Sequence, residues 1–263
     1  MLASTRQREI LHRLVADGYA EAKSLAGDLG VDISTVRRDL AALERAGQAQ
    51  RTHGGARPSP GATAKLPYAM KQSERPAAKS AIAHAAAELV GDGDTVILDS
   101  GSTTYEIAVA LRNRAGLTII TNDLRIGKYV AGLPEMRLLV TGGELLGSVF
   151  TLVGEHAISF LGDYAANWAF LGADAVDPEA GITNMNTLEV PLKRAMITAA
   201  AAAVVVADSS KFGRRALAKI AGPEEVAQII TDSELGDPLA DQFDGRLVRT
   251  ALDRAPAPAD PHP

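Results

Sequence analysis

Short, almost wholly apolar runs alternate with helical patterns over most of this chain, and the alternation restricts its fold more than any other feature. Runs of this kind are typical of strands that are buried on both faces of a sheet. Strands that alternate with helices favour a mainly parallel sheet covered on both faces, so the sequence predicts an α/β fold. The runs are DTVILDS, LTIITND, MRLLVTGG, NWAFLGAD, AAVVVADSS and QIITD, and the helical patterns cover residues 76–90, 104–114, 123–131, 154–161 and 187–201.

Composition limits the classes of function. The chain has 263 residues, 46% of them hydrophobic, which is enough for one sizeable core and a small second domain. Cysteine is absent, so disulfides and thiolate sites are excluded, and we expect neither a metal nor a cofactor. The start, MLASTRQREI, does not resemble a secretory signal, and the longest apolar run is too short to span a bilayer. A soluble cytoplasmic protein without a membrane partner is therefore expected.

A proline-rich stretch divides the chain. Pro58, Pro60 and Pro67 oppose regular structure in a segment that is otherwise rich in Gly, Ser and Ala. The final stretch, APAPADPHP, cannot contribute to a core and is expected to be disordered. We predict an N-terminal domain over residues 1–57, a linker over 58–74, a larger α/β domain over 75–252 and a tail over 253–263.

Three helical patterns fill the start of the chain. Ser4 or Thr5 can cap the first helix, Gly30 ends the second, and Asp32 can cap the third. Two helices that are joined through a short turn containing glycine form the helix-turn-helix pattern. The segment QAQRTHGGA then alternates and turns on two glycines, as the β-hairpin of a winged domain does.

The third helix and the hairpin supply the expected DNA contacts. One apolar stripe, formed by Val36, Leu40 and Leu43, faces the core, and the N-terminal half of the helix is left for base edges. Residues 1–57 hold nine Lys or Arg against seven Asp or Glu, whereas the rest holds 18 against 25, a weak sign of a nucleic-acid-binding head. The expected DNA-binding residues are Ser34, Thr35, Arg37, Arg38, Arg51 and His53.

This N-terminal unit resembles the winged helix-turn-helix of DeoR-family bacterial transcription regulators. The resemblance rests on TVRRDL, on the LER that follows it, and on the terminal HGGA. Asp32 is a mild departure, since the family usually has Ser or Asn as the cap, and aspartate adds a negative charge near phosphates.

In the larger domain, small polar residues follow three of the expected strands. The segment DSGSTT offers backbone N–H groups and hydroxyls at a helix start, which suits a phosphate. TND and TGG follow the next two strands, and ligands of open α/β sheets bind at the carboxyl ends of strands. Each segment alone is most simply a helix cap, but three in one sheet favour a binding cleft.

Further candidates follow in the second half of this domain. Asp174 lies in a loop, and Lys211 lies just past a strand end, a suitable place for binding a phosphate or a sugar hydroxyl. Glu189 and Lys193 are spaced i, i+4 on an expected helix, and the plain interpretation of the pair is a surface ion pair.

The segments DSGSTT, TND, TGG, GITN, KRAM and DSSKFG resemble the C-terminal effector domain of the DeoR family. The resemblance implies a fold similar to ribose-5-phosphate isomerase and the CoA transferases, and a phosphorylated sugar as effector. It implies that the DSGSTT loop and Lys211 hold the effector, with Glu189 near it. The expected effector-binding residues are Asp99, Ser100, Gly101, Ser102, Thr103, Thr104, Thr121, Asn122, Asp123, Gly142, Gly143, Asp174, Glu189 and Lys211.

The sequence therefore predicts a transcriptional regulator, and a repressor of carbohydrate genes in particular. It would bind a double-stranded operator as a homodimer or homotetramer and respond to a phosphorylated sugar. Two alternatives stay open. The larger domain could be a sugar-phosphate isomerase with Glu189 or Asp99 as base and Lys211 stabilising an enediolate, although an isomerase has no need of a winged head. An architectural DNA-binding protein without an effector is the other.

Overall fold

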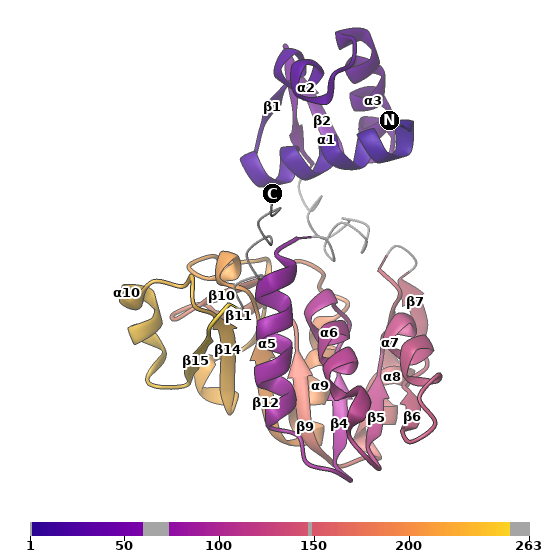
Figure 1. The fold of residues 1–263 in the computed structure, drawn as a ribbon, viewed down its shortest axis with the longest axis vertical. Helices are drawn as coiled ribbons and strands as arrows, with labels where there is room; N and C mark the ends of the chain where they lie inside the picture. Colours follow the sequence, from indigo (N-terminus) through magenta and orange to yellow (C-terminus); the bar gives the residue numbers. More distant parts are fainter. Residues whose placement is uncertain (1, 60–73, 147–148, 253–263) are drawn as a thin grey trace, which may run out of the picture. The chain divides into compact units, whose positions relative to one another are not determined.

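The computed structural model describes residues 2–59, 74–146 and 149–252. The chain forms two compact units, Met1–Lys71 and Gln72–Pro263. Most of the expected linker, residues 60–73, and the expected tail, residues 253–263, lie outside the described residues. Figure 1 shows the helices and strands of both units.

The smaller unit combines three helices with a small antiparallel sheet. The strand order is β1–β3–β2, and β2 and β3 form a hairpin. The arrangement is the predicted winged helix-turn-helix. Its elements are α1 (Ala3–Asp17), β1 (Ala20–Glu21), α2 (Ala22–Leu29), α3 (Ile33–Arg45), β2 (Ala49–Thr52) and β3 (Gly55–Pro58).

The predicted helix caps have different outcomes. Neither Ser4 nor Thr5 is the cap of α1, because the helix already begins at Ala3 and Leu2 occupies the capping position. Asp32 is confirmed as the cap of α3, since its carboxylate accepts a hydrogen bond from the N–H of Ser34 at 2.7 Å. That bond satisfies one of the backbone donors that a helix start leaves without a partner.

The core of the smaller unit comes from all three helices and the hairpin. The three predicted stripe residues of α3 are buried and pack against α1 and α2. Because the three share one face, the opposite face of α3 stays in solvent. The buried residues are Ile10, Leu11, Leu14, Ala22, Leu25, Ala26, Val36, Leu40, Leu43, Ala49 and Ala56.

The two glycines of the hairpin have separate structural roles. Gly54 turns the chain with a φ of 95°, a conformation that favours glycine. Gly55 lies against β1, and a Cβ built on it would be 2.2 Å from the carbonyl oxygen of Ala20. The first glycine therefore permits the turn, and the second permits β3 to pair with β1.

The larger unit is built on a sheet of seven parallel strands (Figure 1). The six predicted strands are present, and β15 extends the sheet at one edge. The strand order is β15–β14–β12–β9–β4–β5–β6, and all neighbours are parallel. The strands are β4 (Thr95–Leu98), β5 (Thr118–Thr121), β6 (Arg137–Val140), β9 (Ala166–Leu171), β12 (Ala200–Val206), β14 (Gln228–Asp232) and β15 (Leu247–Thr250).

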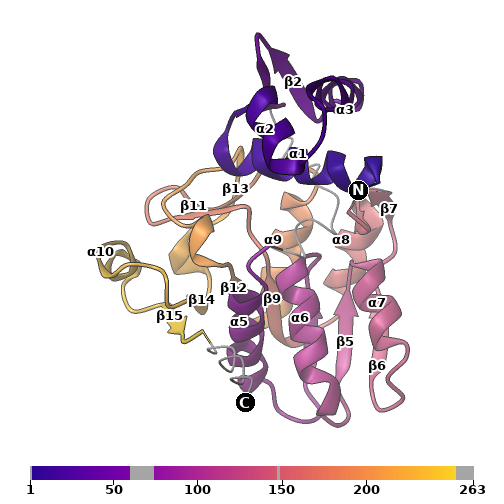
Figure 2. The same cartoon turned by 45° about the horizontal axis from the view of Figure 1, so that its top comes forward.

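Helices cover both faces of this sheet, as predicted. Figure 2 shows α5, α6 and α7 side by side on one face, where they bury one set of strand residues. Helices α8 and α9 cover the other face. The helices are α5 (Pro76–Glu88), α6 (Ser102–Ala110), α7 (Leu124–Val130), α8 (Glu155–Gly162), α9 (Val190–Ala199) and α10 (Asp237–Ala240).

Two small antiparallel sheets flank the large one. The hairpin β7–β8 follows β6, and the three strands β10, β11 and β13 follow β9 and β12. The bounds are β7 (Glu144–Leu146), β8 (Thr151–Val153), β10 (Ala175–Asp177), β11 (Gly181–Asn184) and β13 (Ala218–Ala221).

The connectivity creates a switch point between β4 and β9. From β4 the chain builds outward through β5 and β6, then returns to the other side of β4 and builds outward from β9. The loops that leave β4 and β9 therefore diverge, which is the arrangement of a topological switch point. Ligands of open α/β sheets bind at this place.

The predicted helices differ from the observed ones at their ends. The helix expected over residues 187–201 is shorter, since α9 spans Val190–Ala199. Alanine has the highest helix propensity, yet Ala200, Ala202 and Ala203 pair with β9 as the start of β12. Tertiary pairing overrides local propensity there.

Candidate effector site and nucleic-acid interface

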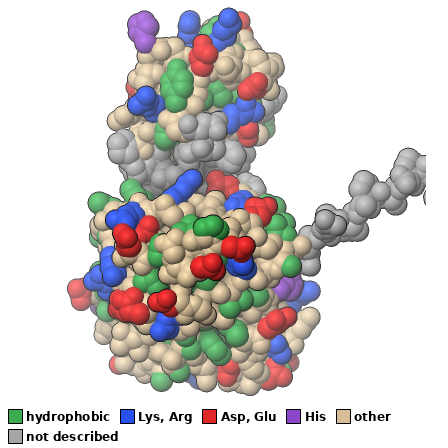
Figure 3. All heavy atoms as spheres, turned by 90° about the vertical axis from the view of Figure 1, so that its left-hand side faces the viewer, with side chains coloured by type: hydrophobic (Ala, Val, Ile, Leu, Met, Phe, Trp, Pro, Cys, Tyr) green, Lys and Arg blue, Asp and Glu red, His purple; other side chains and the backbone are tan. Residues whose placement is uncertain are grey.

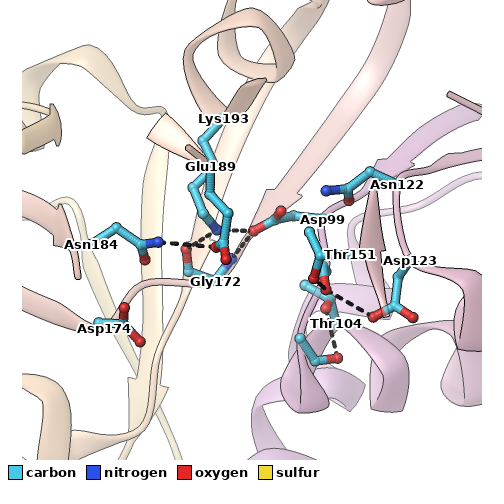
Figure 4. A network of polar contacts seen from close by, with 12 residues as sticks. Asp99, Thr104, Asn122, Asp123, Thr151, Gly172, Asp174, Asn184, Glu189 and Lys193 are labelled. Atoms are coloured by element: carbon cyan, nitrogen blue, oxygen red, sulfur yellow. Dashed lines mark hydrogen bonds and ion pairs between the residues drawn. The ribbon is translucent and has the colours of Figure 1, made fainter. Parts of the chain in front are cut away.

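The switch point is occupied by a buried charge pair (Figure 4). Asp99 follows β4 and is 1% exposed, and Lys193 of α9 is 3% exposed. The ammonium of Lys193 forms an ion pair with the carboxylate of Asp99 and donates to the carbonyl oxygen of Gly172 at 3.0 Å. The N–H of Gly172, just after β9, donates to the same carboxylate at 3.1 Å. Strands β4 and β9 and helix α9 are thus joined at one point.

The expected surface pair between Glu189 and Lys193 is wrong. Lys193 points into the interior, whereas the carboxylate of Glu189 accepts hydrogen bonds from the side-chain amides of Asn184 and Asn186 at 3.0 and 2.9 Å. The i, i+4 spacing does not place the two side chains together on the helix surface, because Glu189 precedes the first residue of α9. Lys193 is a site residue that sequence reasoning missed, and the KRAM segment was the available signal.

Burial opposes charge on both partners of the pair. Burial raises the pKa of Asp99, although the ammonium of Lys193 opposes the rise. Burial acts to lower the pKa of Lys193, but the carboxylates of Asp99 and Glu189 outweigh it, and the pKa is raised. Each charge is therefore tolerated in the interior because its partner is present.

A third carboxylate acts on Lys193, that of Asp174 in the loop between β9 and β10 (Figure 4). Its carboxylate accepts a hydrogen bond from the backbone N–H of Met185 at 2.9 Å and contributes to the raised pKa of Lys193. Three carboxylates, from Asp99, Asp174 and Glu189, therefore act on one ammonium. Carboxylates that are fixed in this way are suitable acceptors for the hydroxyls of a sugar.

The loop that leaves β4 connects the switch point to the ends of β5 and β8. The hydroxyl of Ser100 donates to Asp123 at 3.1 Å and hydrogen-bonds the hydroxyl of Thr151 at 2.5 Å. Gly101 precedes α6, whose first turn contains Ser102 and Thr103. The first backbone N–H groups of a helix have no partner within it, so this turn can donate to an anion.

Several predicted site residues form hydrogen bonds within the protein. Thr104 donates to the carbonyl of Gly101, Thr121 to that of Leu98, and Asn122 to that of Leu152. Asp123 caps α7 by accepting from the backbone N–H of Arg125. These residues fix the carboxyl ends of β4 and β5.

Two glycines follow β6, and the second lies against the neighbouring hairpin. Gly142 and Gly143 have φ values of 69° and 109°. A Cβ on Gly143 would lie 2.4 Å from the carbonyl oxygen of Val153, so β8 approaches here more closely than another residue would allow.

Lys211 lies at the end of the 3-10 helix η3 (Ser209–Lys211), which follows β12. In the sheet, β9 separates β12 from β4.

The predicted DNA contacts lie on the free face of α3 and on the hairpin of the smaller unit. Ser34, Arg37 and Arg38 are exposed, and Thr35 is half-buried. Within the described part of the chain, Arg38 has no hydrogen bond or ion pair, so its guanidinium is available to a ligand. On the hairpin, His53 and Arg51 are exposed, and the N–H of Arg51 donates to Glu44 at 3.2 Å.

Asp39 of the TVRRDL segment has a structural role that the sequence analysis did not assign. It is 3% exposed, and its carboxylate accepts from the guanidinium of Arg6 at 2.5 Å and the amide of Gln7 at 2.9 Å. This contact ties α1 to α3. The signal in the sequence is a charged residue at helical spacing from Val36 and Leu43.

Charged side chains of both signs lie on both units. Figure 3 shows basic and acidic side chains interspersed over the face drawn, on both units. The assignment of the DNA contacts rests on the exposed side chains of α3 and of the hairpin.

Both units match models of one protein family. The DeoR-like helix-turn-helix domain matches residues 6–59, and the DeoR C terminal sensor domain matches residues 74–233. The chain belongs to the DeoR family. It is a DNA-binding transcriptional regulator, as the winged head and the motifs of the larger domain predicted.

Relatives of this DeoR-family regulator match over nearly their whole length. The putative aga operon transcriptional repressor of Escherichia coli O157:H7 is 36% identical over 92% of this chain and 90% of its own length. The HTH-type transcriptional regulator GlpR of Haloferax volcanii is 35% identical, covering 89% and 92%. The glycerol-3-phosphate regulon repressor of Escherichia coli K12 is 29% identical, also covering 89% and 92%. These relatives are regulators, in agreement with the expectation that this chain is not an enzyme.

One structural match is to an enzyme, at a low score. Ribose 5-phosphate isomerase A from Methanocaldococcus jannaschii is 23% identical, with a TM-score of 0.38, over 51% of this chain and 53% of that one. A match at this score carries no argument about function.

No helix within the described ranges is long and apolar enough to cross a membrane.

Proposed function

We propose that this regulator is a repressor of carbohydrate genes that acts in the cytoplasm and is controlled by a phosphorylated sugar or polyol. The observation that carries the proposal is the Asp99–Lys193 pair at the switch point, next to a helix start, in a chain that also has a DNA-binding head. Two relatives are named repressors, and one of them is named for the glycerol-3-phosphate regulon. A homodimer or homotetramer would present its heads to repeated operator half-sites, as dimers of helix-turn-helix proteins do.

The residues of the larger unit divide the proposed site into two ends. At one end, the first turn of α6 and the hydroxyl of Ser100 would accept a phosphate, assisted by Lys211. At the other end, Asp99, Asp174 and Glu189 would accept hydroxyl donors of the carbon chain. A phosphate is disfavoured at this second end, because three carboxylates surround a single ammonium.

The effector would act by binding two arrangements of the protein with different affinity. An effector that prefers the arrangement with weak operator affinity releases the DNA, and by linkage the operator weakens effector binding by the same factor. Couplings of this kind typically change affinity by about 5–150-fold.

The experiment that tests the proposal is a fluorescence-anisotropy titration of the full chain against the DNA upstream of its own gene. The titration is repeated with sn-glycerol 3-phosphate and a panel of pentose and hexose phosphates. We expect one phosphate to weaken operator binding within the range above. Sequence-specific binding that no phosphate alters would support the architectural alternative. Failure to bind the DNA specifically would contradict the proposal for the head.

Substituting Lys211 by Ala should separate sensing from DNA binding. The lysine lies in the larger unit and outside the winged head, so operator affinity should stay within about twofold of the wild-type value, whereas the response to the active phosphate should be lost. Lys219→Ala is the matched control, because Lys219 is an exposed lysine on β13. A response of normal size in Lys211→Ala would remove this lysine from the proposed site.

A further inference from the structure

Arg75 holds an unusual position at the start of the larger unit. It immediately precedes α5 and adopts the left-handed conformation, with φ 48° and ψ 52°. A non-glycine residue in this region carries strain and persists where its surroundings fix it. The residues that precede it include the segment 60–73, through which the chain continues from the winged head.

Three carboxylates fix the guanidinium of Arg75. One Nη atom lies 3.3 Å from the carboxylate of Asp208, and the other lies 3.2 Å from that of Asp232 and also pairs with Glu234. Asp208 and Asp232 are 5% and 0% exposed. Arg75 is therefore their compensating cation at the carboxyl ends of β12 and β14, and buried carboxylates require such a partner.

The same two carboxylates hold the turn that carries Lys211. Asp208 accepts from the N–H of Ser210 at 3.1 Å and from its hydroxyl at 2.5 Å. Asp232 accepts from the N–H of Ser209 at 2.7 Å and from its hydroxyl at 2.9 Å. The turn 208–211 and the start of α5 thus share two acceptors, and a displacement of either one must disturb the other.

A second cation holds the start of α5 from the helix side. Lys79 is 5% exposed, and its ammonium donates to the carbonyl oxygen of Glu74 at 2.5 Å. The N–H of Lys79 donates to the carbonyl of Arg75 at 3.1 Å. Residues 74 and 75 are therefore attached both to α5 and to the strand ends.

We propose that Arg75 is a positioning residue that couples the turn 208–211 to the segment leading to the winged head. An anion that binds at Lys211 adds negative charge next to Asp208 and draws Lys211 toward itself. Either change alters the electrostatic attraction between the three carboxylates and the guanidinium of Arg75. The start of α5, which Arg75 precedes, would then change its position. The identity of the anion rests on the proposed function, whereas the mechanical link between turn and helix start does not.

Hydrogen exchange in the full-length protein tests the link without any effector. Ser209→Ala removes one hydroxyl from the turn, and we expect exchange of the Lys79 amide to rise by about tenfold. Arg75→Gln should raise exchange of the Lys211 and Phe212 amides, whose carbonyl acceptors belong to Asp208 and Ser209, by a similar factor. Arg112→Gln is the control, since Arg112 is exposed and donates only to the carbonyl of Val109 within the described residues. Unchanged exchange at both distant sites would overturn the proposal.

The response to sn-glycerol 3-phosphate provides a readout that a merely structural role would not change. Where this probe weakens operator binding by the wild type, Arg75→Gln should bind the probe with a Kd within about twofold of the wild type but lose most of the release. Arg75→Lys keeps the charge without the planar fork, so it should fold normally and show an intermediate release. Full release in both variants would contradict the coupling and leave the proposed function intact. If no phosphate releases the wild type, the proposed function fails and hydrogen exchange alone decides the coupling.

Discussion

Replacing Lys193 by Met should lower the free energy of unfolding of the larger unit by about 3–5 kcal/mol, because removal of one partner leaves the other charge buried and uncompensated. Asp99 is 1% exposed, and its other donor is the N–H of Gly172. For a unit of this size, the loss corresponds to a fall in Tm of about 6–20 °C. Scanning calorimetry of the full chain, with the transition of the larger unit followed separately, measures it.

A double variant identifies the cause of that loss. In Asp99→Asn/Lys193→Met neither position of the pair carries a charge, so at least half of the lost stability should return, by about 2 kcal/mol or more. Lys128→Met is the matched control, since Lys128 is an exposed lysine on α7. An unchanged Tm in Lys193→Met would show that the pair does not compensate Asp99 in solution.

The pH dependence of this difference has a defined sign. The pKa of Lys193 is raised above its ordinary value of 10.5, so its contribution is complete below that value. The contribution is lost as the pH rises through the raised pKa. The difference in stability between the wild type and Lys193→Met should therefore hold from neutral pH to about pH 9 and diminish only in strong alkali.

Replacing Arg38 by Ala should weaken operator binding by about 5–150-fold, the effect of losing one guanidinium contact of about 1–3 kcal/mol with a base or phosphate. Arg38 is exposed on α3 and, among the described residues, has no partner within the protein, so its loss should leave the fold unchanged. Fluorescence anisotropy against operator DNA measures the affinity, and the thermal transition checks the fold.

The control for this variant lies on the same helix. Arg45 is exposed in the last turn of α3 and donates to the carbonyl of Ala41. Arg45→Ala should lose far less affinity, because the N-terminal half of a recognition helix meets the bases. Affinity of Arg38→Ala for the active phosphate should equal that of the wild type. Equal operator affinity of Arg38→Ala and the wild type would contradict the assignment of Arg38 as a DNA-binding residue.

Much of the candidate interface could be predicted from the sequence, because its pattern is local. Val36, Leu40 and Leu43 are spaced so that they share one helical face, which leaves Arg37 and Arg38 exposed wherever the helix packs. The burial of Asp39 could not be predicted in this way. Its burial depends on Arg6 and Gln7 of another helix, and helical spacing alone does not reveal such partners.

The carboxyl ends of the strands were predictable as a group, but their chemistry was not. The runs that end in DS, TND and TGG had to converge once a parallel sheet was inferred. Which of these polar residues face a ligand depends on what else lies at that edge. Thr121 and Asn122 are engaged by backbone carbonyls of β4 and β8, and the sequence contains no sign of that.

The sequence by itself determined the two domains, the winged head and the parallel sheet, since helical and strand periodicities are properties of neighbouring residues. Only the tertiary structure decided the partners of the buried charges. Asp99 meets Lys193 94 positions later, and Arg75 meets Asp208 and Asp232 133 and 157 positions later. Those contacts follow from the order of the seven strands in the sheet. That order decides which opposite charge lies beside each buried charge and can pair with it.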